Sequence, residues 1–185
     1  MIENSRFSEN TAPASGGAIN AFNGSGNTVR ANLFFGNSSG KGGAICEQSA
    51  LQDIVGNTFD GNTGGQGAAI GGYSGSPSIE ENIFSNQTGF AIDCSAMVAS
   101  IGCNDFWQNS AGNGNNCAIA PEEGNIFLDP LFCEVVTRNF AIHSDSPCTA
   151  THVPAGCGRM GAFGVGCGDT PTLPVTWGRL RALFR

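Results

Sequence analysis

An internal repeat constrains the fold of this chain more than any other feature of its sequence. Each unit has an aliphatic residue, an Asn three positions later and a Phe five positions later, as in Ile54, Asn57 and Phe59. Six units align on their aliphatic residues, which are Ile2, Val29, Ile54, Ile79, Ile101 and Ile126. The steps between them are 27, 25, 25, 22 and 25 residues. Ser5 takes the Asn position in the first unit, and Asp129 and Leu131 replace Asn and Phe in the last.

A second marker, Ala followed by Ile and often preceded by Gly, repeats in step with the first. It occurs at Ala18-Ile19, Ala44-Ile45, Ala69-Ile70, Ala91-Ile92, Ala118-Ile119 and Ala141-Ile142. A further Asn lies three residues after the Phe at Asn10, Asn37, Asn62 and Asn109. Independent markers with one period predict stacked units that each form one turn of a solenoid.

The spacing within a unit predicts how each turn is built. The aliphatic residue and the Phe are five positions apart, so they cannot both face a core from one straight strand, in which side chains alternate. The chain must bend between them, at the Asn, a residue that tolerates left-handed backbone angles. Stacked turns would then align a hydrogen-bonded Asn ladder of Asn32, Asn57, Asn82 and Asn104. The Gly-Gly-Ala-Ile marker predicts a second tight corner.

These features predict an all-β fold, a parallel β-helix of about six coils. Coils in a parallel sheet lie about 4.8 Å apart, so six of them form a rod roughly 25 to 30 Å long. No sustained 3.6-residue apolar period precedes the last dozen residues. Leucine-rich repeats need frequent Leu, which is rare here. A sandwich of unrelated strands would not explain an Asn column that stays in step.

The pattern resembles the right-handed parallel β-helix repeat proteins, and its later part resembles a recurring C-terminal region of secreted bacterial members. The residues that carry this resemblance are 103–107, 129–133, 140–142, 144–148, 156–158, 161–163 and 166–168. The resemblance implies a right-handed helix that is the C-terminal part of a secreted or cell-surface bacterial protein. Polysaccharide lyases, glycoside hydrolases and adhesins share this scaffold, so it implies no single reaction. The chain matches none of the catalytic motifs of the lyases and hydrolases.

Three regions are predicted along the chain. Residues 1–148 form the coils, 149–168 form a Gly/Cys-rich terminal cap, and 169–185 form a linker and a basic C-terminal tail. The segment from Trp177 to Arg185 is short, basic and amphipathic. Two interpretations of this tail remain open: a sorting or docking segment, or a helix that caps the last coil and protects its sheet edges.

The charge distribution and the lack of long apolar runs limit which partners and which cellular locations we expect. All 15 acidic residues lie at or before Asp169, whereas Arg179, Arg181 and Arg185 belong to the tail, which leaves five basic residues and a charge of −10 on residues 1–169. This negative charge would repel the phosphate backbone of a nucleic acid, so we do not expect nucleic acid as a partner. No run of about 18 apolar residues predicts a membrane span. The start lacks a signal peptide, so export would require a signal upstream of this segment.

Eight cysteines without a CxxC pair favour an oxidising compartment over zinc or redox chemistry. They allow about 105 connectivities. Cys148 and Cys157 are the best local pair, because Pro and Gly residues around them mark turns. Cys46 lies two coils, or about 9.6 Å, from Cys94, which exceeds the limit of about 7 Å for the Cα atoms of a disulfide. We therefore expect Cys46 and at least one other cysteine to be free.

The residue after each core Phe should point outward, in the column Ser8, Phe35, Asp60, Ser85, Trp107 and Phe132. Within it, Phe35, Asp60 and Trp107 are the predicted carbohydrate-binding residues, because aromatic rings stack on sugars and carboxylates accept their hydroxyl hydrogens. The alternative is that Phe35 and Trp107 pack beneath loops. Asp60 and Asp93 are the acids considered for catalysis or calcium. Calcium needs about 6 to 8 oxygen ligands and glycosidases need a spaced carboxylate pair, so no catalytic residue, metal site or cofactor is assigned, and calcium stays open.

The sequence therefore favours a non-catalytic extracellular or cell-surface module, structural or carbohydrate-binding, with a polysaccharide or cell-envelope component as its partner. The alternative is a fragment of a polysaccharide lyase or glycoside hydrolase whose active site lies partly in coils upstream. The first coil presents an unpaired parallel edge, which predicts self-association through this end.

Overall fold

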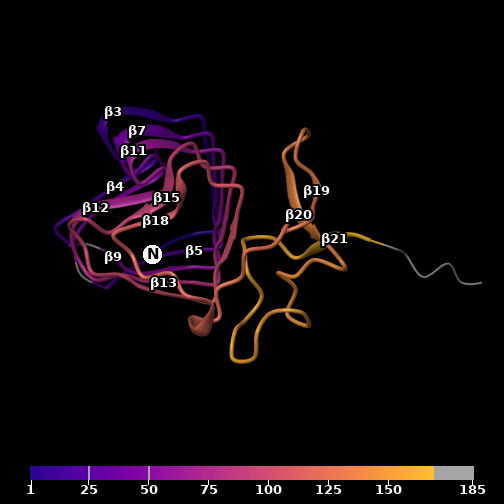
Figure 1. Ribbon diagram of the computed structural model, residues 1–185. Coiled ribbons are helices and arrows are strands. Elements are labelled where there is room, and N and C mark those ends of the chain that lie inside the picture. The colour runs from indigo at the N-terminus through magenta and orange to yellow at the C-terminus, as the bar shows by residue number, and fades with distance from the viewer. Residues whose placement is uncertain (25, 50, 169–185) are drawn as a thin grey trace, which may run out of the picture.

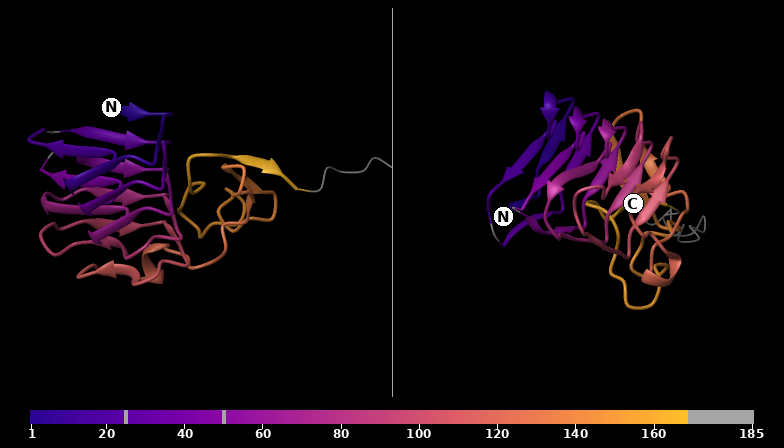
Figure 2. Two further views of the ribbon diagram at one scale, coloured as in Figure 1. Left: turned by 90° about the horizontal axis from the view of Figure 1, so that it is seen from above. Right: turned by 60° about the vertical axis from the view of Figure 1, so that its left-hand side comes forward.

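The computed structural model describes residues 1–24, 26–49 and 51–168, which form a parallel β-solenoid of about six turns and a C-terminal segment beside it. Figure 1 looks along the stack, and Figure 2 shows its coils one above another, with a C-terminal segment at their side. The predicted all-β solenoid is confirmed. The predictions for the tail, Trp177 to Arg185, lie outside the described residues.

Four sheets run along the solenoid. Five successive coils each add one strand to sheets A, B and D, and the first three coils each add one strand to sheet C. Sheet A contains β1 (Ile2–Glu3), β5 (Asn27–Arg30), β9 (Leu51–Val55), β13 (Ser78–Glu80) and β16 (Ser100–Gly102). Sheet B contains β2 (Arg6–Ser8), β6 (Leu33–Phe35), β10 (Thr58–Asp60), β14 (Ile83–Ser85) and β17 (Asp105–Trp107). Sheet C contains β3 (Thr11–Ser15), β7 (Ser38–Lys41) and β11 (Thr63–Gln66). Sheet D contains β4 (Ile19–Phe22), β8 (Ile45–Gln48), β12 (Ile70–Ser74), β15 (Phe90–Asp93) and β18 (Gly112–Asn115).

The core consists of like residues stacked from coil to coil. The Phe column of sheet B stacks with ring centroids 4.8 to 5.0 Å apart and interplanar angles of 6° to 9°, through Phe7, Phe34, Phe59, Phe84 and Phe106. Sheet A aligns the aliphatic column in register, Ile2 with Val29, Ile54, Ile79 and Ile101. Because the coil spacing matches the stacking distance of aromatic rings, each repeat buries its Phe against its neighbours.

The predicted Asn ladder is confirmed between sheets A and B. Asn57 donates from its main-chain N–H and from Nδ2 to Oδ1 of Asn82, at 2.8 and 3.0 Å, and its Nδ2 also reaches the carbonyl of Val29 at 2.9 Å. Asn32 bonds Asn57, and Asn82 bonds Asn104, in the same way. These amides are buried, and the ladder satisfies main-chain groups of the bend that would otherwise be costly.

The backbone strain at this bend lies one residue earlier than predicted. The left-handed angles belong to the residue before each ladder position, with φ of 52° at Ala31, 62° at Gly56, 57° at Glu81 and 55° at Cys103. The ladder asparagines themselves do not have positive φ. Asn is therefore required for its hydrogen bonds and not for its tolerance of left-handed angles.

A second ladder lies between sheets B and C and uses the other Asn marker. Asn37 donates to Oδ1 of Asn62 at 2.9 and 3.0 Å, and Asn62 donates from its main chain to Oε1 of Gln87 at 3.1 Å. Gln87 in turn bonds Oδ1 of Asn109 at 3.1 Å. Gln87 occupies the coil in which the Asn marker is missing, so its longer amide keeps the ladder continuous.

The Gly-Gly marker forms the predicted tight corner between sheets C and D. Gly42 has a φ of +60° and Gly67 one of +77°, which favour glycine. A Cβ on Gly43 would lie 2.2 Å from the carbonyl oxygen of Ala68 and 2.3 Å from that of Thr63. Neighbouring coils thus approach so closely here that no side chain fits.

The sixth unit has a different register from the predicted Ile126, Asp129 and Leu131. Asn125 supplies the last ladder amide, because its Oδ1 accepts the main-chain N–H of Asn104 at 3.0 Å. Phe127 extends the Phe column, 6.1 Å from Phe106. The aliphatic residue expected three positions before the Asn is absent here, since η1 (Pro121–Glu123) occupies that stretch.

The C-terminal segment packs along the side of the solenoid, over sheet B. The last parallel bridge to a preceding coil joins Asp105 and Ile126, which is well before the predicted boundary at residue 148. Beyond it lies a three-stranded sheet E of β19 (Phe132–Glu134), β20 (Asn139–His143) and β21 (Val165–Cys167). A second apolar cluster of Ile83, Ile142, Cys148 and Met160 joins this segment to the solenoid. Both views place the segment beside the stack and not on its end (Figures 1 and 2).

Hydrogen bonds attach the C-terminal segment to several coils. Nη2 of Arg6 in the first coil donates to the carbonyl of Arg138 at 3.3 Å. The N–H of Ala162 donates to Oγ1 of Thr58 at 3.0 Å, and that of Gly161 donates to the carbonyl of Glu81 at 2.7 Å. With the contact between Cys148 and Asp105 in the fifth coil, the segment spans the stack from the first coil to the fifth.

The cysteines form three disulfides, and the predicted Cys148–Cys157 pair is wrong. The pairs are Cys94–Cys117, Cys103–Cys157 and Cys133–Cys167. Cys157 lies over the fifth coil, where its Cα is 5.4 Å from that of Cys103. The Cys148 thiol instead faces the carboxylate of Asp105. Cys46 and Cys148 are both free and buried, which confirms the expectation for Cys46 and for a second free thiol.

Three disulfides fit an oxidising setting. Among the described residues, no helix has the length and hydrophobicity needed to cross a bilayer.

Candidate functional site

The outward column predicted from the repeat exists on sheet B. Ser8, Phe35, Asp60, Ser85 and Trp107 are register partners on neighbouring strands. Phe132 is not part of this column, because it lies in β19 of the C-terminal segment. The segment covers much of the column, so its members have different environments.

Asp60 is buried beneath the C-terminal segment, with 3% of its surface exposed. Its Oδ1 accepts hydrogen bonds from Oγ of Ser85 at 2.6 Å and from Nδ2 of Asn86 at 2.8 Å. Burial raises the pKa of Asp60, and the bonds from Ser85 and Asn86 oppose that rise. Asp60 therefore positions Ser85 and Asn86 and does not itself present a carboxylate to a ligand.

Phe35 packs against the C-terminal segment, as the alternative interpretation predicted. Its ring centroid lies 5.6 Å from that of Phe140, and the guanidinium carbon of Arg138 lies 4.9 Å from the Phe35 centroid. Arg138 also pairs with Glu9. Phe35 thus anchors the segment through its contacts with Phe140 and Arg138.

Trp107 lies in a cleft of about 330 Å³ between the solenoid and the C-terminal segment. The solenoid wall consists of Ser85, Asn86, Trp107 and Gln108. The opposite wall consists of Asp129, Pro130, Leu131, Phe132 and Val135. Two aromatic rings, two carboxamides and one carboxylate thus face one concavity, which we call the Trp107 cleft.

Asn86 and Gln108 occupy a repeat position at which the second and third coils have glycine and the first coil has Glu9, with a φ of 58°. The position two residues after the core Phe has a φ of 61° at Gly36, 60° at Gly61, 55° at Asn86 and 50° at Gln108. Left-handed angles strain residues other than Gly, and such strain is concentrated at functional sites. The spacing of the repeat marks Glu9, Asn86 and Gln108 as departures from glycine, and the structure places Asn86 and Gln108 in the cleft while Glu9 pairs with Arg138.

The Trp107 cleft retains unused hydrogen-bonding capacity. Gln108 is exposed, and within the described chain its amide has no partner. Asp129 uses Oδ1 to accept the N–H of Leu131 at 2.9 Å. An exposed amide and a carboxylate beside aromatic rings are the groups that orient a polar ligand in a pocket.

Asp93, the other acid considered for catalysis or calcium, lies on sheet D away from this cleft. Its Oδ1 accepts the N–H of Ser95 and its Oδ2 accepts Nδ2 of Asn115, both at 2.8 Å. Burial acts to raise the pKa of Asp93, but the hydrogen bonds from Asn115 and Ser95 outweigh it, and the pKa lies below its usual value. The bonded carboxylate has a structural role in this loop. Within the described ranges, no three His, Cys, Asp or Glu side chains form a metal-binding group.

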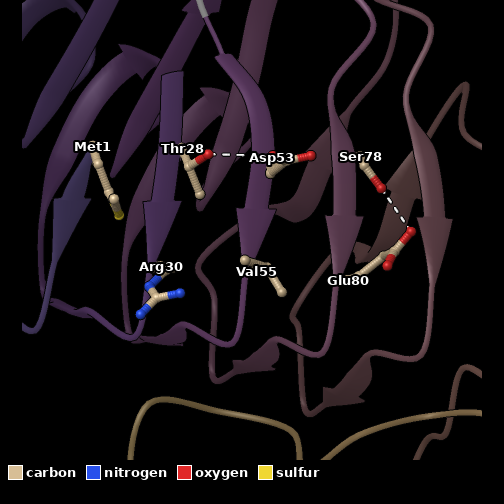
Figure 3. Close-up of a pocket in the computed structure, with 7 residues that line it drawn as sticks. All are labelled: Met1, Thr28, Arg30, Asp53, Val55, Ser78 and Glu80. Carbon is tan, nitrogen blue, oxygen red and sulfur yellow. Dashed lines mark hydrogen bonds between the residues drawn. The ribbon is translucent and has the colours of Figure 1, made fainter. Parts of the chain in front are cut away.

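A second concavity, of about 360 Å³, lies on the outer face of sheet A. Figure 3 shows the residues that line it: Met1, Thr28, Arg30, Asp53, Val55, Ser78 and Glu80. Its polar groups largely satisfy one another, since Thr28 donates to Asp53 at 3.2 Å, Ser78 donates to Glu80 at 2.7 Å, and Arg30 pairs with Glu3 at 2.8 Å. This surface carries no aromatic ring and is the weaker candidate for a ligand site.

Comparison of the sequence with protein-family models, with curated proteins and with solved structures found no match. The geometry of the cleft is therefore the basis for the function proposed below.

Proposed function

We propose that this protein is a secreted or cell-surface, non-catalytic module that binds polysaccharide through the Trp107 cleft. The observation that carries the proposal is the approach of Trp107 and Phe132 to the open amide of Gln108 and the carboxylate of Asp129. Aromatic rings stack on the apolar faces of sugars, while amides and carboxylates bind their hydroxyls. A polysaccharide or a glycan of the cell envelope is the partner that this chemistry fits.

The acid content of the cleft favours binding over cleavage. Glycosidases use two carboxylates that flank the scissile bond, about 5 to 9.5 Å apart. Asp129 is the carboxylate that lines this cleft, and nearby Asp60 is buried and holds Ser85 and Asn86. Binding without turnover is the outcome consistent with this arrangement.

Retention on immobilised glycans, with simultaneous assay of reducing and unsaturated ends, tests the proposal. We expect retention without release of ends. Trp107→Ala should weaken retention about five- to 150-fold, if a sugar stacks on the ring as strongly as a nucleic-acid base does, at about 1 to 3 kcal/mol. Phe22→Ala is the matched control, since Phe22 is an exposed ring (65%) on sheet D outside the cleft. Retention that Trp107→Ala leaves unchanged would overturn the site. Release of ends by the protein would overturn its non-catalytic character and favour the lyase or hydrolase alternative.

A further inference from the structure

We propose that the Trp107 cleft selects amino sugars, whose protonated amine is positively charged, over uronic acids and sulfated sugars. The inference rests on the proposed function and adds the charge of the ligand. It follows from the one charged side chain that lines the cleft, Asp129, and from the absence of Arg and Lys from that lining.

Asp129 gives the cleft its only charged side chain among the lining residues. Its Oδ1 is fixed by the N–H of Leu131 at 2.9 Å, and no described group donates to its Oδ2. One carboxylate oxygen is thus held in position by the backbone while the other remains open to a ligand. An ammonium group is the donor that gains most from an ionised acceptor.

No Arg or Lys side chain is among the residues that line the cleft. Two of the described arginines, Arg30 and Arg138, are also paired with the carboxylates of Glu3 and Glu9. A uronate or sulfate in the cleft would face Asp129 with no Arg or Lys in the lining to offset the repulsion.

The aromatic walls add to the same preference. Trp107 and Phe132 line opposite sides of the cleft, and the faces of aromatic rings attract cations. The −10 charge of residues 1–169 also draws cations toward the surface at low ionic strength. Carboxylate, rings and net charge therefore all favour a positively charged ligand.

Binding of three matched oligosaccharides to the full chain tests the inference. The probes are a glucosamine oligomer, the same oligomer fully N-acetylated, and an oligogalacturonate, each titrated calorimetrically in low salt at about pH 5, where the sugar amine is protonated and an ordinary Asp carboxylate is ionised. We expect the glucosamine oligomer to bind roughly three to ten times more tightly than the N-acetylated one, and the oligogalacturonate to bind least. This preference should shrink as salt is added.

Asp129→Asn isolates the carboxylate, because the amide retains an Oδ1 acceptor for the N–H of Leu131. In this variant we expect the two glucosamine-based oligomers to bind within about twofold of each other. Asp53→Asn removes the same charge from sheet A and should leave the preference intact. Equal binding of the two oligomers by the unaltered protein, or tighter binding of the oligogalacturonate, would overturn the charge selectivity and leave glycan binding standing. Absence of binding to all three would overturn the inference together with the proposed function.

Discussion

The thiol of Cys148 donates a hydrogen bond to Oδ2 of Asp105 at 3.3 Å, and both side chains are fully buried between sheet B and the C-terminal segment. Oδ1 of Asp105 accepts the N–H of Leu128 at 3.2 Å. Burial raises the pKa of Asp105 from 3.8 to about 7, and the bonds from Leu128 and Cys148 oppose that rise only in part. Burial and the adjacent Asp105 also raise the pKa of Cys148, so this cysteine remains a thiol. The pair is thus neutral below about pH 7.

The first prediction is that Asp105 makes the protein more stable in acid. An acid whose pKa is raised on folding contributes most below its unfolded pKa, and this contribution is lost as pH rises toward the folded pKa. We therefore expect the free energy of unfolding to fall by up to roughly 4 kcal/mol between about pH 4 and about pH 7 on account of this group. Urea unfolding across this range, compared with Asp105→Asn, measures it.

Asp105→Asn should reduce this pH dependence, because the amide is neutral throughout while its oxygen still accepts the N–H of Leu128. Asp53→Asn, on the outer face of sheet A, serves as the control and should retain the slope. The same slope in Asp105→Asn as in the unaltered protein would contradict the assignment.

The second prediction concerns the Asn ladder. Asn82→Ala should lower the free energy of unfolding by roughly 2 to 5 kcal/mol, because the N–H and Nδ2 of Asn57 lose their acceptor and the carbonyl of Ile54 loses its donor, all in the interior. Asn10→Ala, at the exposed end of the second ladder, should cost less than about 1 kcal/mol. Denaturant titrations measure the free energy of unfolding of both variants. Equal decreases in the two would show that burial does not determine how much a ladder amide stabilises the fold.

The third prediction separates the observed disulfide from the one expected from sequence. The double variant Cys103→Ser with Cys157→Ser opens a loop of 54 residues, and chain entropy sets its cost at about 4 kcal/mol. Cys148→Ser should cost less than about 1.5 kcal/mol, because a hydroxyl can still donate to Asp105. Thermal unfolding compares the two variants. Mass spectrometry of peptides from the unreduced protein should find residue 103 linked to residue 157, and a link between 148 and 157 would refute the assignment.

The fourth prediction is self-association through the first coil. Strands β1, β2, β3 and β4 each have one strand neighbour among the described residues. Unpaired edges are templates for pairing, and an inward-pointing charge blocks them. We expect sedimentation to show concentration-dependent dimers that Ile19→Lys dissociates. Val136→Lys is the control, since Val136 is an apolar residue with 90% exposure in the C-terminal segment. A monomer at high protein concentration would contradict this prediction.

Local spacing was sufficient to predict the solenoid because its contacts repeat. Asn57 and Phe59 follow Ile54 at fixed offsets, and the next coil repeats these offsets. Stacking equivalent residues of successive coils then buries each Phe and gives each Asn amide a hydrogen-bond partner. The register failed in the sixth unit because Asn125 and Phe127 retain the Asn and Phe without the aliphatic residue before them. The outward column of Phe35, Asp60 and Trp107 followed from the same alternation.

The C-terminal segment decided what the repeat could not. Nothing in the local sequence shows that Phe140 covers Phe35, that Cys157 pairs with Cys103, or that Asp129 faces Trp107, because each contact joins residues that no period relates. The sequence by itself therefore determined the stack, because the contacts that stabilise it join each coil only to the next and repeat along the solenoid. Only the tertiary structure decided which outward residues are buried and which line a cleft, because that depends on where one non-repeating segment returns to pack along the solenoid.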